Sequence, residues 1–172
     1  LDSWLFSSEN YNYIKKVLQN KKCEVFLSKE IFVDKIWKKK RKKINSKIFI
    51  REKKYSGVSF KNKIQYVKKI LQNKKVSNFF FSSPESISWL LNIRSNQINY
   101  TPVVLSFLLL KMYNKSYFFG KSDIRIKKYL APYFSTFDIS NLKEILINFS
   151  ITNKEIYLDP KKTPYFIESF FK

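Results

Sequence analysis

The 172-residue sequence contains no histidine, one cysteine, one alanine and two glycines. Without histidine it has no Ser-His-Asp or Cys-His catalytic arrangement and no histidine-containing zinc site. Gly57 and Gly120 lie too far apart to form a glycine-rich phosphate loop. The single Cys23 excludes an internal disulfide and fits a reducing compartment. These absences exclude several common enzyme classes before any motif is considered.

Carboxylates are also scarce, with 13 Asp and Glu against 34 Lys and Arg. They are scattered along the chain and show no pair or triad with the spacing of a metal site. Asp138 is expected to begin a helix and Asp159 to stabilise a turn before Pro160. We therefore predict that the chain carries no catalytic residue, no metal ligand and no cofactor of its own.

The net charge of +21 is typical of proteins that bind nucleic acid. However, 30 of the 34 cations are Lys, and Asn, Ile, Phe and Tyr are abundant as well. An AT-rich genome produces this composition in proteins of every function. Arginine, which makes the best bidentate phosphate contacts, occurs only four times. We expect no nucleic-acid partner, and a basic nucleic-acid-binding domain stays open as an alternative.

Apolar residues make up 44% of the chain, and 18% of the residues are aromatic, so a sizeable core can form. The longest apolar run, residues 103–110, is far shorter than the roughly 20 residues that span a bilayer. The start of the chain shows no signal-peptide pattern. We expect a cytoplasmic protein with no membrane partner. The Leu start and the apolar helical pattern at the end predict that both ends are cut.

Apolar spacing and turn residues predict alternating helices and strands. Helices are expected to begin at Ser7 or Ser8, Ser59, Ser83, Ser122, Ser140 and Thr163. Strands are expected over residues 23–27, 76–81, 103–113, 116–119 and 155–158, with a turn at Asn114. Lys61 and Lys63 oppose the dipole of their helix and are expected to reach into solvent. This order predicts an α/β fold, a layered α/β/α domain with a mixed sheet.

The charge pattern also suggests a domain boundary. Residues 38–43 are almost entirely basic, as in a solvated linker. We expect residues 1–43 to be the C-terminal part of a first α/β domain plus this linker. Residues 44–172 are expected to form a second domain.

Residues 83–94 are the most informative segment. Ser83, Pro84 and Glu85 mark a helix start, and the apolar residues that follow share one face. Arg94 follows the apolar run, where a cation is favoured near a helix C-terminus. On this interpretation Arg94 is a partner of the helix dipole.

The same segment carries a family resemblance. Trp-Leu-Leu-Asn-Ile-Arg at residues 89–94, followed by Pro102-Val103, resembles a non-catalytic region of Xaa-Pro aminopeptidases of the creatinase/prolidase N-terminal type. Four weaker matches occur in the same order as in that family: residues 1–5, 34–37, 55–59 with Lys63, and 158–160. Where relatives commonly have Arg-Gly-x-Asp, this chain has Ser95 and Gln97 in place of the Gly and the Asp.

The resemblance implies that the chain is a non-catalytic region of a larger metallopeptidase, in which it shapes the cleft and the subunit interface. In that family a C-terminal catalytic domain of the pita-bread type holds two divalent metal ions, usually manganese, and hydrolyses the N-terminal Xaa-Pro bond. That domain is absent from this chain. The partners implied are the catalytic domain, a second subunit in a homodimer, and proline-containing peptides. Arg94 is the substrate-cleft candidate, as a cation for a carboxylate.

A second class of function stays open beside this one. A free-standing domain of the same fold can serve as a peptide- or protein-interaction module without catalysis. A continuation of the coding sequence past Lys172 into metal ligands would favour the peptidase.

Overall fold

The computed structural model describes residues 1–28, 35–37, 47–152 and 155–171. Contacts divide the chain into two compact units. The N-terminal unit comprises Leu1–Ile44 together with Asp159–Lys172, and the sheet unit comprises Asn45–Leu158. The expected domains, 1–43 and 44–172, stay a prediction, and the basic linker at 38–43 lies outside the described residues.

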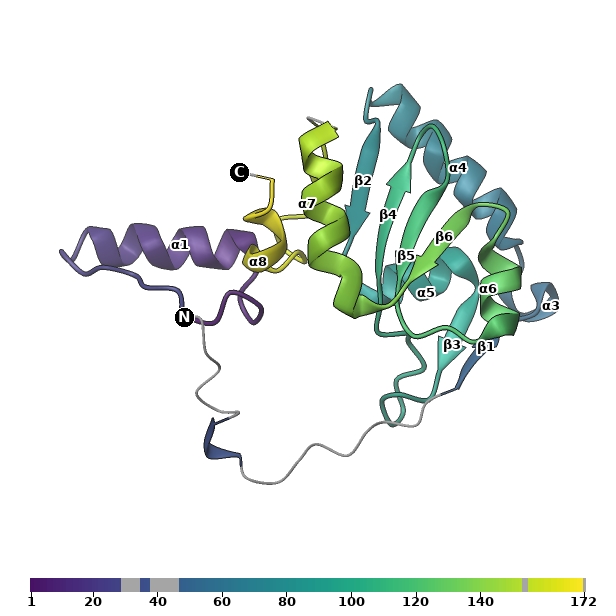
Figure 1. Cartoon of the computed structure of the whole chain (residues 1–172), viewed down its shortest axis with the longest axis horizontal. Helices are drawn as coiled ribbons and strands as arrows, with labels where there is room; N and C mark the ends of the chain where they lie inside the picture. The colour runs from purple at the N-terminus through teal and green to yellow at the C-terminus, as the bar shows by residue number, and fades with distance from the viewer. Residues whose placement is uncertain (29–34, 38–46, 153–154, 172) are drawn as a thin grey trace. The chain divides into compact units, whose positions relative to one another are not determined.

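A five-stranded mixed sheet is the centre of the sheet unit (Figure 1). Its strands are β2 (Asn78–Phe81), β4 (Phe107–Lys111), β5 (Ser116–Phe119), β6 (Phe134–Phe137) and β7 (Tyr157–Leu158). They lie in the order β6-β5-β4-β2-β7. The two outer pairs are parallel and the two inner pairs antiparallel. The mixed sheet expected from the sequence is confirmed.

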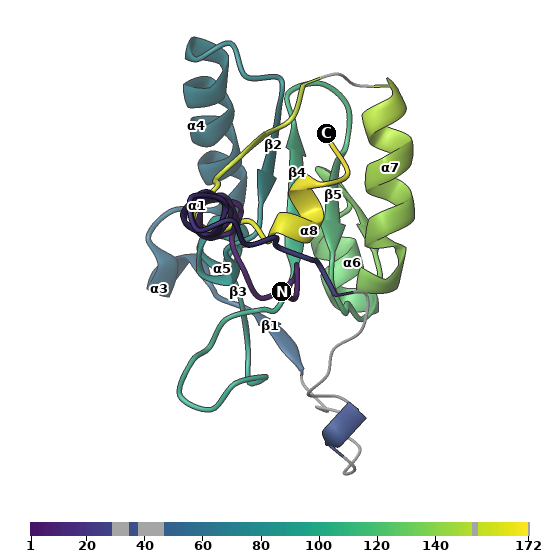
Figure 2. The same cartoon turned by 90° about the vertical axis from the view of Figure 1, so that its left-hand side faces the viewer.

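Helices cover both faces of this sheet. They are α4 (Phe60–Asn73), α5 (Pro84–Leu91), α6 (Ile124–Leu130) and α7 (Leu142–Thr152), the last preceded by the 3-10 turn η1 (Ile139–Asn141). The short helix α3 (Lys53–Ser56) precedes α4 and buries none of its residues. Figure 2 shows α4 and α7 on opposite sides of the strands. This arrangement confirms the layered α/β fold.

Alternation along the strands supplies an apolar surface to each face. On one face Leu108, Leu110 and Phe118 join a buried cluster with residues of α4, α5 and α6. On the other face the ring of Tyr117 lies 5.4 Å from that of Phe137 and 6.2 Å from that of Phe149 on α7. The sheet is thus the shared wall of two cores.

Short polar side chains begin α4, α5 and η1 as expected, whereas α7 begins at Leu142, two residues after the predicted Ser140. Ser59 caps α4, Ser83 caps α5 and Asp138 caps η1, each by accepting a backbone N–H. Asp123 caps α6, one residue later than the predicted start at Ser122. The caps fix where each helix enters the fold.

In the five-stranded sheet, one predicted strand is much too long and one strand was not predicted. Of the strand expected over residues 103–113, only β4 pairs with other strands. The backbone amides that precede β4 donate to side chains instead. Val104 N–H donates to Ser88 Oγ at 2.8 Å, and Leu105 N–H donates to Gln97 Oε1 at 2.8 Å. Strand β6 was not predicted, because its four residues form a strand only by pairing in parallel with β5.

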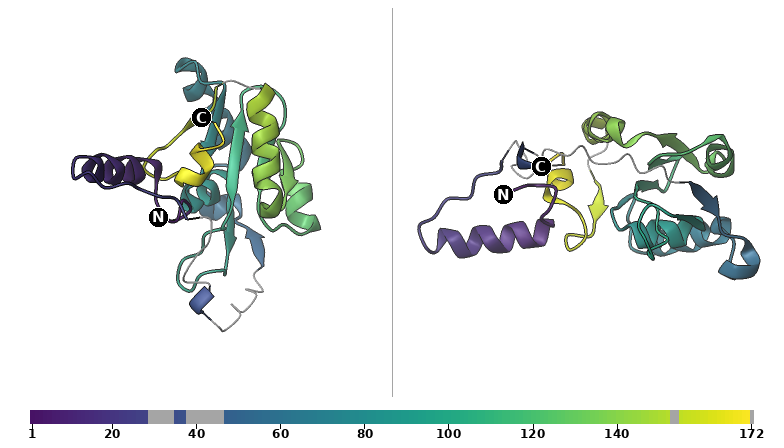
Figure 3. Two further views of the ribbon diagram at one scale, coloured as in Figure 1. Left: turned by 60° about the vertical axis from the view of Figure 1, so that its left-hand side comes forward. Right: turned by 90° about the horizontal axis from the view of Figure 1, so that it is seen from below.

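The N-terminal unit joins the two ends of the chain. Helix α1 (Ser8–Gln19) is capped by Ser7, and α8 (Tyr165–Glu168) follows Pro164. Ser8 N–H donates to the carbonyl of Thr163 at 3.0 Å, and the rings of Tyr11 and Tyr165 stack at 3.8 Å. Figure 3 shows α8 beside the start of α1.

The strand predicted over residues 23–27 is wrong. The segment is irregular: the Cys23 N–H donates to the carbonyl of Leu18, and Leu1 bonds Phe26 and Ser28. Without a neighbouring strand, the apolar residues of this segment have no partner for backbone hydrogen bonds of the β type.

None of the helices within the described part of the chain has the length and apolar character to cross a bilayer.

Candidate functional site

The candidate site forms around the C-terminus of α5. The helix ends at Leu91, and Asn92 takes the left-handed conformation, with φ 52° and ψ 40°. Asparagine tolerates this conformation because its side chain can bond locally. The Asn92 amide donates to Val58 O at 2.8 Å, and its Oδ1 accepts from Lys63 Nζ at 2.7 Å. Asn92 therefore ties the end of α5 to α4.

Lys63 was expected in solvent, and this prediction is wrong. The residue is only 5% exposed. Its ammonium donates to the carbonyl of Trp89 at 2.9 Å as well as to Asn92, and it lies 4.3 Å from the centroid of the Trp89 ring. The prediction considered only the dipole of Lys63's own helix. The structure brings the negative end of the neighbouring helix α5 to this cation.

Arg94 lies in strand β3 (Ile93–Ser95), which pairs with β1 (Ile48–Ile50) as a separate two-stranded ribbon. Its NH1 donates to the carbonyl of Ser88 at 2.7 Å and to that of Ile93 at 2.8 Å. Both are charge-assisted bonds, and the first satisfies a carbonyl near the end of α5. The interpretation of Arg94 as a partner of the helix end is therefore supported by direct contact.

Three cations gather here. Burial lowers the pKa of the Lys63 ammonium, and nearby Arg94 lowers it further. Burial also lowers the pKa of Arg94, with a smaller effect from Arg51. Arg51 lies over the ring of Tyr55 at 4.4 Å. Within the described residues none of the three cations has an ion pair with a carboxylate, so the site has the electrostatics to attract an anion.

The loop after β3 is held by the two residues that depart from the family pattern. Ser95 Oγ accepts from Gln97 N–H at 3.2 Å, and Gln97 in turn accepts from Leu105 N–H. Ser95 does not have a positive φ, so this backbone does not require the glycine of relatives. Both substitutions are compatible with an ordered loop.

The same loop encloses an open pocket of about 450 Å³. Its walls come from β1, β3 and the following loop: Phe49, Ser95, Asn96, Ile98, Asn99, Tyr100, Thr101 and Pro102. Tyr100 is fully exposed and has a φ of 60°, and Phe49 and Ile98 are exposed as well. An exposed apolar group of this kind on a positive-φ loop is suited to contact with another surface.

The donor set of the described residues does not fit a pair of metal ions. The sequence has no histidine. In the described ranges no three Cys, Asp or Glu residues come together in a way that could hold an ion. No chemical step at a metal centre is therefore assigned to these residues.

Sequence reasoning found Arg94 but missed Asn92, Lys63 and Lys111. Lys111 follows the apolar run of residues 103–110, inside the strand expected over residues 103–113, and the sequence did not mark it as a site residue. It is buried in the structure. Its signal was the period of the strand, which gives it the same face as Phe107 and Leu109.

Comparisons with known proteins agree on one family. A model of the creatinase/prolidase N-terminal domain matches residues 38–172. The probable Xaa-Pro aminopeptidase P of Coprinopsis cinerea is 31% identical over 108 residues, 62% of this chain and 17% of that protein. Xaa-Pro aminopeptidase 1 of Dictyostelium discoideum is 25% identical over 173 residues, 95% of this chain and 28% of that protein.

A solved structure has the same fold. The X-prolyl aminopeptidase from Caenorhabditis elegans, described as a cytosolic enzyme with a di-nuclear active site, aligns with a TM-score of 0.88 at 21% identity. The alignment covers 99% of this chain and 29% of that one. The chain thus spans less than a third of the length of each of these relatives.

Proposed function

This chain belongs to the creatinase/prolidase N-terminal domain family, and from this we propose that it is the non-catalytic region of a metal-dependent Xaa-Pro aminopeptidase. The observation that carries the proposal is the alignment of nearly the whole chain with less than a third of an X-prolyl aminopeptidase. The parent enzyme would hydrolyse the peptide bond between an N-terminal residue and proline. Two divalent metal ions, manganese in our proposal, would supply the hydrolytic chemistry from a C-terminal catalytic domain outside this chain.

The part that this chain plays in the enzyme is to shape the substrate cleft. Arg94 is our candidate for contact with a carboxylate. Its NH1 is occupied by two carbonyls, whereas Nε and NH2 have no hydrogen bond to any residue that the structure describes. A guanidinium held on one side and open on the other is suited to bind a carboxylate of a peptide or of the cleft.

We assign the interface role to the surface of Phe49, Ile98 and Tyr100. These exposed apolar side chains surround the pocket of the loop after β3. A homodimer is the assembly we propose for them. Sedimentation of the chain at rising concentration tests this, and a monomer throughout would contradict it. A cytoplasmic location is proposed from the description of the Caenorhabditis elegans enzyme as cytosolic.

A chimera tests the main proposal. In the Dictyostelium discoideum relative, the 28% that aligns with this chain is replaced by residues 1–172. We expect the chimera to hydrolyse a peptide with proline in second position, and the relative lacking this segment to be inactive. The 172-residue chain alone, with manganese, should release no product. Activity of the chain alone would overturn the non-catalytic assignment.

A folded but inactive chimera would overturn the proposed role in the enzyme. If the chain also bound proline peptides by itself, that result would favour the interaction-module alternative. Folding of the chimera is checked by circular dichroism and by a cooperative thermal transition. These readouts separate failure of function from failure of structure.

Arg94 is tested in the active chimera. If it binds a substrate carboxylate, Arg94→Met should raise KM about tenfold with little change in kcat, and Arg94→Lys should fall between. An unchanged KM together with a lower melting temperature would mean that Arg94 serves only the end of α5.

A further inference from the structure

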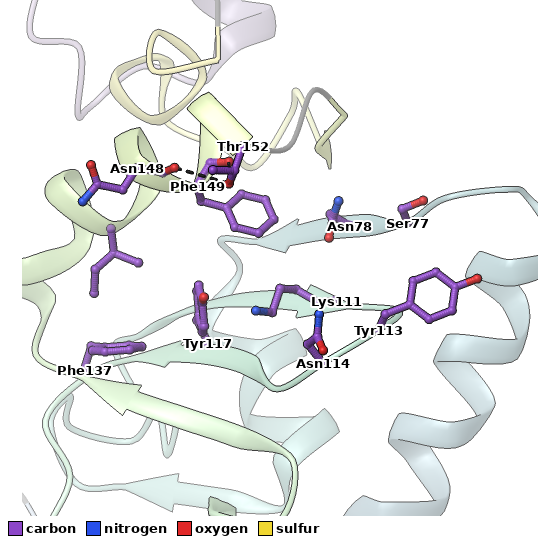
Figure 4. A pocket seen from close by; sticks show the side chains of 11 residues that line it. Ser77, Asn78, Lys111, Tyr113, Asn114, Tyr117, Phe137, Asn148, Phe149 and Thr152 are labelled. Carbon is purple, nitrogen blue, oxygen red and sulfur yellow. Dashed lines mark hydrogen bonds between the residues drawn. The ribbon is translucent and has the colours of Figure 1, made fainter.

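A second site lies on the opposite face of the sheet from α4 and α5. A pocket of about 590 Å³ opens between the β4–β5 hairpin, the start of β2 and helix α7 (Figure 4). Pockets of roughly 300–1,000 Å³ hold small organic ligands. All of its lining residues belong to the sheet unit.

Among the described residues that line the pocket, Lys111 is the only charged one. It is 9% exposed, on a strand whose preceding residues are apolar. Its Nζ lies 3.8 Å from the centroid of the Tyr117 ring and 5.8 Å from that of Phe149. Figure 4 shows the side chain lying across the pocket floor, with the amine toward Tyr117.

The ammonium of Lys111 has no hydrogen bond or ion pair to any part of the chain that the structure describes. An ammonium has three N–H donors, and burial of a charge is costly unless it is paired. Cation–π contacts with two rings offset part of this cost, but they do not give the N–H donors a hydrogen-bond acceptor. The site therefore holds a buried cation that is open toward the pocket.

The remaining walls define what an anion must look like. Tyr117, Phe137, Ile145 and Phe149 supply aromatic and aliphatic surface. Asn78, Asn114 and Asn148 supply amide groups. The described lining residues include no Arg, Asp or Glu. A pocket with one cation among aromatic walls is suited to a ligand with one negative charge attached to an apolar group. The pocket does not have the several cations that a phosphate prefers.

We propose that this pocket binds a small organic monocarboxylate with an aromatic or branched apolar group. The carboxylate would accept from the Lys111 ammonium, and the apolar group would lie against Tyr117 and Phe149. The site is distinct from the Arg94 region, and its existence does not depend on the aminopeptidase proposal.

Binding of phenylacetate to the 172-residue chain, followed by titration calorimetry and by NMR of the aromatic side chains, tests the proposal. Phenylacetamide has nearly the same shape without the charge. We expect saturable binding of phenylacetate, at least tenfold tighter than that of the amide, with shifts of Tyr117 and Phe149 signals. No binding, or equal binding of the two probes, would overturn the proposal. This pair requires no mutation, so it does not depend on the folding of a variant.

Variants then locate the charge. Lys111→Met should weaken phenylacetate at least tenfold, and Lys111→Arg should retain most of the affinity. Lys115→Met removes an exposed cation from the same hairpin and should change the affinity less than twofold. Equal losses in Lys111→Met and Lys115→Met would indicate attraction to the net charge instead of a site. Inorganic phosphate that binds as tightly as phenylacetate would overturn the proposed ligand class.

Discussion

Lys63 and Lys111 are both buried in the sheet unit, on opposite faces of the sheet, and their surroundings differ. Lys63 donates to a main-chain carbonyl and to Asn92 at the end of α5. Lys111 contacts aromatic rings, and its ammonium makes no hydrogen bond to a described residue. The comparison separates a cation used to hold two helices together from a cation left open to a pocket. Burial of a charge by itself identifies neither role; the partners do.

The largest effect is expected from Lys63→Met. The substitution leaves the Trp89 carbonyl and Asn92 Oδ1 without their donor, which costs roughly 1–3 kcal/mol of the free energy of unfolding. Urea unfolding followed by circular dichroism measures it. Lys61→Met, which changes an exposed lysine two residues earlier, should stay within about 0.5 kcal/mol of wild type. Equal effects of Lys63→Met and Lys61→Met would contradict the structural role of Lys63.

A smaller and pH-dependent effect on stability is expected from Tyr129, which connects α6 to the end of α5. Its hydroxyl donates to the carbonyl of Leu91 at 3.2 Å, and burial raises the pKa of Tyr129 to about 12. The neutral phenol is thus favoured in the folded state. The contribution of Tyr129 to stability is complete below pH 10 and is lost as the pH rises from 10 to 12.

Tyr129→Phe tests this linkage. The variant should be less stable than wild type by about 1 kcal/mol at pH 8, where the hydrogen bond is lost. The difference should shrink between pH 10 and pH 12. Thermal unfolding of both proteins across this range measures it, and a constant difference would contradict the raised pKa.

The smallest effect on the free energy of unfolding is expected from Lys111→Met. A large effect would contradict the difference that we infer between Lys63 and Lys111. The substitution removes cation–π contacts but also a buried charge, and methionine fits an aromatic pocket. We expect the free energy of unfolding to change by less than about 1 kcal/mol. A loss as large as that of Lys63→Met would mean that Lys111 is structural, and would weaken the ligand proposal.

Much of the fold follows from local sequence. Ser59 and Ser83 begin their helices as expected because a cap needs only a short polar side chain and a free N–H. Asn114 takes a positive φ after β4, as the hairpin requires. Strand β6 was missed and residues 23–27 were assigned wrongly because pairing depends on a partner strand far away in the sequence.

The candidate site was predicted only in part. Arg94 was identified from its position after an apolar run, and its contact with Ser88 agrees with that interpretation. The roles of Lys63 and Asn92 could not be predicted, because both depend on how α4 and α5 meet. The apolar periodicity of one helix does not predict how a neighbouring helix is oriented against it.

The sequence by itself determined the helix starts, the absence of histidine chemistry and the family resemblance, because each depends on residue identity and short spacing. Only the tertiary structure decided which lysines are buried and what they contact. It also decided that residues 159–171 join the N-terminal segment through Tyr11 and Thr163. The physical reason is the same in each case: burial and pairing are set by groups that are distant along the chain and adjacent in space.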